Sequence, residues 1–104
     1  MTMTTLGIIG DRSFADLSRI FDVLDQYEDV ERIAIADHIG LSACAIGWAK
    51  AHDIPALVLP DRGNIFDHID TLIYFADVPV PESVKGLLKE ACDDYKVKLR
   101  LVTV

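Results

Sequence analysis

A length of 104 residues with 51% hydrophobic residues predicts one folded domain, residues 1–104, with a single core, and excludes a disordered chain. The net charge of −7 argues against nucleic-acid binding, because general nucleic-acid binding needs a basic surface. The longest apolar runs, such as 54–60, are too short to cross a bilayer, and the first residues lack the basic region and apolar core of a signal peptide. We therefore expect a cytoplasmic protein that contacts no membrane.

Short apolar segments predict strands over 6–9, 32–36, 54–59, 71–76 and 97–104, the last half-exposed near a sheet edge. Helical spacing of apolar residues predicts helices over 14–28, 41–52 and 82–95, with a short helix or helical turn at 65–69. Strand–helix–strand units this short are typical of right-handed crossovers and a parallel sheet. The expected fold class is α/β, a three-layer Rossmann-like, doubly wound sheet of about five mainly parallel strands with helices on both faces.

Each helix is expected to bury one apolar face. In the first helix, Ser13 is a good N-cap, and Asp16 stands close to a capping-box position. Its apolar stripe is Phe14, Leu17, Ile20, Phe21, Leu24 and Tyr27. The second helix is rich in small residues, with Trp48 as its bulky anchor, and the last carries Val84, Leu87, Leu88, Ala91, Cys92 and Tyr95 on one face. Cys44 and Cys92 form no CxxC motif and are expected to be buried free thiols.

Polar residues follow three of the predicted strands: Asp11, Arg12 and Ser13 the first, Asp37 and His38 the second, and Asp77 the fourth. Because the carboxyl ends of parallel strands share one edge of a sheet, we expect these residues to converge on one crevice. The alternative is that they only cap helices and end strands. Arg12 is the candidate contact for a phosphate or carboxylate, since a guanidinium binds either one bidentately; its alternative is a surface ion pair with Asp11 or Asp16. His38 is a candidate acid–base group or a hydrogen-bonded loop residue.

Several well-defined motifs are absent from the sequence. The segment 7–10 is neither a GxGxxG fingerprint nor a P-loop, and no GxSxG nucleophile elbow occurs. No two histidines have a metal-ligand spacing, so neither a metal nor a cofactor is expected.

The first turn nevertheless resembles a known pattern. Residues 10–14, Gly-Asp-Arg-Ser-Phe, stand where the SLOG superfamily of Rossmann-like nucleotide-binding domains has Gly-Ser-Arg-x-Phe, above all in its small bacterial and phage branch related to YspA and YpsA. Arg62-Gly63-Asn64 and the strand headed by Asp70 are similar to the Arg-Asn pair and Asp-headed strand of that family. The resemblance implies a nucleotide-binding domain and a homodimer. The residues expected to line the ligand are Gly10, Asp11, Arg12, Ser13, Asp37, His38, Gly40, Ser42, Asp77 and Ser83.

The chain also departs from that family. Where SLOG proteins have a Gly-Gly turn and a Gly-x-Asp that cradle phosphate, this chain has 36–42, in which only Gly40 fits the pattern. Asp37 puts a negative charge where the phosphate would bind, which weakens such binding. The later Gly-Thr turn is replaced by 79–83, where Ser83 offers a hydroxyl without the glycine. The catalytic Glu signature of the phosphoribohydrolase branch is absent.

Three functions follow from this pattern. The leading hypothesis is non-catalytic binding of a nucleotide or nucleotide-derived molecule, with Arg12 on its anionic group. The competing hypothesis is a degenerate SLOG-like fold, an oligomeric or phage accessory protein that acts through protein contacts without a nucleotide. The third is hydrolysis of a glycosidic bond, for which Asp37 and Asp77 are the candidate carboxylates.

Overall fold

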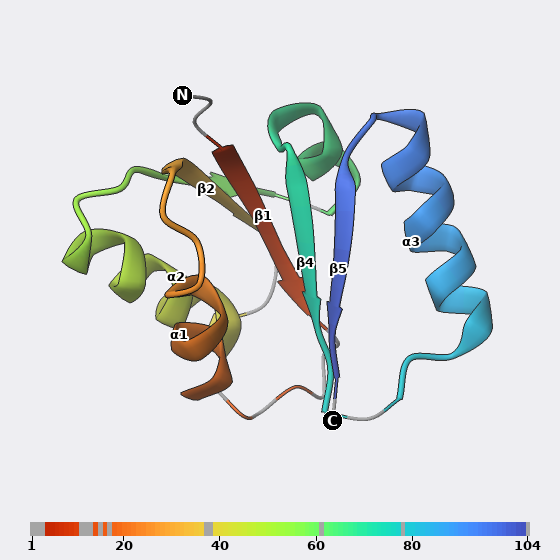
Figure 1. Ribbon diagram of the computed structural model, residues 1–104, viewed down its shortest axis with the longest axis horizontal. Coiled ribbons are helices and arrows are strands. Elements are labelled where there is room, and N and C mark those ends of the chain that lie inside the picture. The colour runs from red at the N-terminus through yellow and green to blue at the C-terminus, as the bar shows by residue number, and fades with distance from the viewer. Residues whose placement is uncertain are drawn as a thin grey trace.

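The computed structural model describes residues 4–10, 14, 16, 18–36, 39–60, 62–77 and 79–103 (Figure 1). Its elements, in chain order, are β1 (Thr4–Gly10), α1 (Ser18–Leu24), β2 (Val30–Ala36), α2 (Ile39–Ala51), β3 (Ala56–Leu59), the 3-10 helix η1 (Arg62–His68), β4 (Thr71–Phe75), α3 (Glu82–Asp94) and β5 (Lys98–Val102). This order confirms the predicted alternation of strands and helices, including the short helix between the third and fourth strands.

The five strands form one sheet in the order β3-β2-β1-β4-β5, and every neighbouring pair is parallel. The fold is therefore the predicted doubly wound, Rossmann-like α/β sheet, here entirely parallel. From the central β1 the chain winds outward through β2 to β3 and then crosses back to β4 and β5. As predicted, β5 lies at an edge of the sheet and is only partly buried.

Two helical layers cover the two faces of the sheet (Figure 1). On one face, α1 and α2 pack over alternate residues of the central strands, including Ile8, Ile35 and Phe75. On the other face, η1 and α3 pack over the residues in between, including Ile9 and Tyr74. Because both faces are covered, β1 reads as a continuous apolar run rather than as an alternating one.

Trp48 is the anchor that the sequence predicted for α2. Its side chain is buried in the core, and its indole Nε1–H donates a hydrogen bond of 2.8 Å to Oδ1 of Asp25, just after α1. The ring of His52 lies against it, with centroids 4.5 Å apart. The side chain of Trp48 therefore joins the carboxyl ends of the two helices on this face.

The first helix is shorter than predicted. It ends at Leu24, whereas the apolar spacing predicted helix as far as Glu28. The N–H of Tyr27 bonds to the carbonyl of Leu24 at 3.1 Å, a 3-10 spacing that tightens the turn and ends the helix. The Tyr27 hydroxyl then accepts a bond of 3.3 Å from Arg100 on β5. Phe21, predicted in the buried stripe, is 40% exposed.

Asp70 fastens the amino ends of three strands. Its carboxylate accepts the backbone N–H of Thr5 at 2.9 Å, and its own N–H donates to the Thr5 carbonyl at 2.9 Å. Its carbonyl accepts the N–H of Lys98 at 3.0 Å. One residue thus links the starts of β1, β4 and β5, which gives the Asp that heads the fourth strand a structural role.

We expect Asp70→Ala to lower the free energy of unfolding by about 1–2 kcal/mol, because the buried N–H of Thr5 loses its acceptor. Urea unfolding followed by circular dichroism measures the loss. Asp67→Ala, at an exposed position of η1, is the matched control and should change stability by less than about 0.5 kcal/mol. Equal stability of the two variants would contradict the role given to Asp70.

Both cysteines are free, as predicted, but they differ in burial. Cys92 is buried, whereas Cys44 is half-buried, so that the expectation of two buried thiols holds for only one of them. Burial, and after it the charge of Asp93, raises the pKa of the Cys92 thiol above its ordinary value of 9.0. The folded chain therefore holds this proton more tightly than the unfolded chain does.

In a Cys44→Ala background, alkylation at pH 8 should be much slower in the folded chain than in urea, because Cys92 is buried and stays protonated. The contribution of the protonated Cys92 thiol to the free energy of unfolding should be fully present below pH 9.0 and be lost as the pH rises through the raised pKa of this thiol. Mass spectrometry of the alkylated chain gives the rates. Equal rates with and without urea would contradict the burial of this thiol.

Candidate functional site

Every neighbouring pair of strands is parallel, so the carboxyl ends of the five strands lie along one edge of the sheet. The arrowheads of β1, β4 and β5 mark this edge in Figure 1. The segments after β1, β2 and β4, which carry the predicted polar residues, therefore start at this edge. Asp11, Arg12, Ser13, Asp37 and His38 themselves lie outside the described residues. The prediction that Ser13, one of these residues, is the N-cap of the first helix is wrong, because α1 begins only at Ser18.

The strand order creates a topological switch point between β1 and β4. These strands are neighbours, with Gly10 paired to Phe75 at their carboxyl ends. The chain leaves β1 toward α1 on one face and leaves β4 toward α3 on the opposite face. Connections that diverge in this way leave a crevice above the strand ends, and in doubly wound sheets ligands bind there.

Gly10 has a packing role at this edge. A Cβ added to it would lie 3.0 Å from Cδ2 of Leu41 and 3.0 Å from the carbonyl oxygen of Phe75. Leu41 is fully buried in the core, and the Phe75 carbonyl belongs to the sheet, so neither can move away cheaply. Glycine at position 10 therefore avoids two tight contacts whether or not a ligand approaches it.

We expect Gly10→Ala to lower the free energy of unfolding by about 1–3 kcal/mol without any ligand, because of this overpacking. Gly86→Ala in α3 is the control. No atom lies near the added Cβ there, and the better helix propensity of Ala should raise stability by about 0.5–1 kcal/mol. Thermal unfolding followed by circular dichroism compares the variants. A Gly10→Ala variant as stable as the wild type would show that the packing around Gly10 adjusts.

Four other predicted residues are described. Gly40 and Ser42 are half-buried near the start of α2, Asp77 is half-buried after β4, and Ser83 is exposed near the start of α3. Both helices begin after strands that end at the carboxyl edge, and the amino end of a helix carries the positive end of its dipole, which favours an anion. The structure thus places these residues near one edge but on two faces of the sheet.

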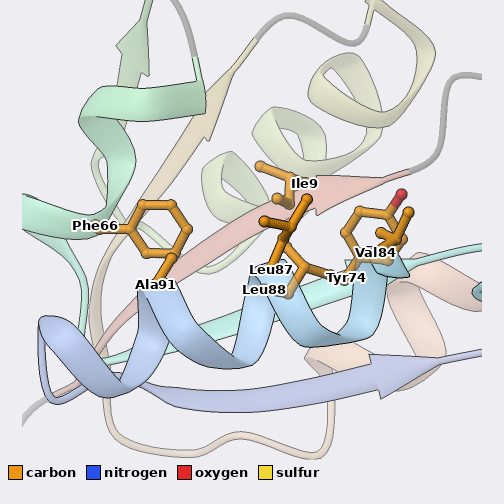
Figure 2. Close-up of a pocket in the computed structure, with 7 residues that line it drawn as sticks. All are labelled: Ile9, Phe66, Tyr74, Val84, Leu87, Leu88 and Ala91. Atoms are coloured by element: carbon orange, nitrogen blue, oxygen red, sulfur yellow. The ribbon is translucent and has the colours of Figure 1, made fainter. Parts of the chain in front are cut away.

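The structure also contains an apolar groove that the sequence did not reveal. It has a volume of about 320 Å³ and lies between α3, η1 and the sheet (Figure 2). Its floor is formed by Ile9 of β1 and Tyr74 of β4, which are register partners in the switch pair. Its walls are Phe66, Val84, Leu87, Leu88 and Ala91.

The groove follows from a short crossover. The connection between β3 and β4, residues 60–70, contains only the 3-10 helix η1, which is shorter than α3. Its end packs closely on β1, where a Cβ added to Gly7 would lie 2.5 Å from Cδ1 of Ile69. Ile9, the next residue of β1 on this face, is only 2% exposed and forms the floor of the groove together with Tyr74, beside Phe66 of η1.

The predicted apolar face of α3 is consequently only partly buried. Cys92 is buried, but Leu87 is 68% exposed and Tyr95 is 49% exposed. The sequence predicted one apolar face for this helix, and the structure leaves these two residues exposed on it, although the ring of Tyr95 stacks on Phe66 of η1. The short crossover at 60–70 is the sequence signal from which an uncovered face could have been inferred.

Comparisons of the chain with protein-family models, with curated proteins and with solved structures find no match. Over the described residues, no group of three or more His, Cys, Asp or Glu side chains is arranged to hold a metal ion. In the same part of the chain, no helix is both long enough and apolar enough to span a membrane.

Proposed function

We propose that the chain binds a nucleotide or a nucleotide-derived small molecule at the carboxyl edge of its sheet, without a catalytic step. One observation carries the proposal: the strand order places a switch point between β1 and β4, and the residues of the Gly-Asp-Arg-Ser-Phe segment follow β1 there. The resemblance to the SLOG superfamily belongs to this proposal and supplies the class of ligand.

Arg12 is assigned to the anionic group of the ligand. The chain carries a net charge of −7, so an anion needs a local cation to bind, and Arg12 follows Gly10 by two residues. Backbone N–H groups at the starts of α2 and α3 supply further donors. Asp37 opposes phosphate in the turn after β2, which favours a ligand whose charged group stays on the β1 side of the crevice.

A second candidate is a protein that acts through contacts with other proteins and has lost the nucleotide. The packing of Gly10 favours it, because Leu41 and Phe75 account for this glycine without a bound phosphate. The exposed Leu87 on α3 is a further apolar contact that a partner would cover.

Isothermal titration with nucleoside monophosphates, cyclic nucleotides and ADP-ribose derivatives should detect binding of at least one of them. Arg12→Ala should weaken that binding by about tenfold to a hundredfold, since a hydrogen bond to a charged group contributes about 1.5–3 kcal/mol. Lys50→Ala is the matched control, because it removes one positive charge near the carboxyl end of α2 and should leave the affinity unchanged.

Two results would contradict the proposal. One is the absence of binding across the whole panel. The other is an affinity that Arg12→Ala leaves unchanged. A stoichiometric protein partner, recovered with no small molecule in native mass spectra, would instead decide for the second candidate.

A further inference from the structure

We infer that the apolar groove beside α3 receives the base of the ligand, a planar aromatic ring system, while the phosphate end stays at the carboxyl edge of the sheet. The inference rests on the proposed function. It adds the part of the ligand that is recognised and the residues that recognise it.

The lining of the groove selects for such a group. None of its seven side chains is charged, so the groove offers no cation to neutralise a phosphate. Phe66 of η1 is half-buried and presents an aromatic ring in the wall of the groove, which suits contact with a flat ring, and the largely buried Tyr74 lies in its floor (Figure 2). The volume of about 320 Å³ stands at the lower end of the range for small-molecule sites.

The groove also runs in the required direction. Val84 stands near the start of α3, and Ile9 is next to Gly10, so this end of the groove meets the carboxyl edge. Toward the other end, the rings of Phe66 and Tyr95 stack with centroids 5.7 Å apart. One molecule can therefore place its anionic end above the strand ends and its ring in the groove.

The shape of this face favours a small ligand over a protein partner. Most of the wall residues are half-buried, and among the described residues of this face only Leu87 and Tyr95 are large exposed hydrophobics. Two such side chains form a small patch, whereas a stable protein interface buries about 800 Å² on each partner.

The test compares each of AMP, GMP, CMP and UMP with ribose 5-phosphate, which has the same phosphate and sugar but no base. In the wild type, the tightest nucleotide should bind at least about tenfold more tightly than ribose 5-phosphate, because only the nucleotide fills the groove. Ala91→Phe fills the groove and should bring the nucleotide affinity down to that of ribose 5-phosphate. The affinity for ribose 5-phosphate itself should not change.

Two further variants serve as controls for the effect of Ala91→Phe. Lys89→Phe adds the same ring to the same helix outside the groove and should leave both affinities unchanged. Leu87→Ser removes an apolar wall side chain that is 68% exposed, so this variant should fold even if Ala91→Phe does not. It should weaken the binding of the nucleotide but not that of ribose 5-phosphate. Circular dichroism confirms that each variant is folded.

The outcomes separate this inference from the proposed function. If ribose 5-phosphate binds as tightly as every nucleotide and Ala91→Phe changes nothing, the inference is overturned and the proposed function stands. If neither the nucleotides nor ribose 5-phosphate binds, the proposed function fails. If adenosine, which has a base but no phosphate, also fails to bind, the assignment of the base to the groove is overturned as well. A wild-type dimer that Leu87→Ser converts to a monomer, with ligand binding unchanged, would show that a second copy covers the groove.

Discussion

The pairing of β1 with β4 is the contact on which the rest of the structure depends. It joins the two halves of the chain, because β1 begins the half that winds outward through β2 to β3, and β4 begins the half that ends at β5. Asp70 fastens this pair at its amino end through both backbone groups of Thr5. At its carboxyl end Gly10 lies against Phe75, where an added Cβ would lie 3.0 Å from the Phe75 carbonyl oxygen. The same pair therefore fixes both the stability of the central sheet and the position of the crevice above it.

A parallel sheet has to be covered on both faces, and this chain covers its faces unequally. The face under α1 and α2 is closed by large buried side chains such as Leu41 and Trp48. On the opposite face Ile9 and Tyr74 are buried too, but the side chains above them leave a groove whose wall includes the exposed Leu87. Exposed apolar surface costs roughly 25 cal/mol for each Å² that could have been buried. Any molecule that fills the groove recovers part of that free energy on binding.

The fold was predictable from local patterns, because the strands of a sheet buried on both faces are apolar runs and the helices between them keep a 3.6-residue period. What could not be predicted depends on residues far apart in the chain. After α1 ends at Leu24, the hydroxyl of Tyr27 accepts a hydrogen bond from Arg100, a residue 73 positions away in the chain. Likewise, the exposure of Leu87 depends on the length of the crossover before β4 and not on the sequence of α3 itself. The polar residues of the candidate site could be recognised in the sequence by their residue types. The face of the sheet on which each of them lies could be assigned only once the strand order was known.

Two residues that carry the family resemblance have structural roles that need no ligand. Gly10 avoids tight contacts with the side chain of Leu41 and the carbonyl of Phe75, and the carboxylate of Asp70 accepts a hydrogen bond from the backbone N–H of Thr5. A sequence that keeps only these positions would keep the fold even after losing the nucleotide, so they support the architecture more strongly than the activity. The features that point to a ligand are instead those that packing does not require, namely the groove whose wall includes the exposed Leu87 and the arginine two residues beyond Gly10.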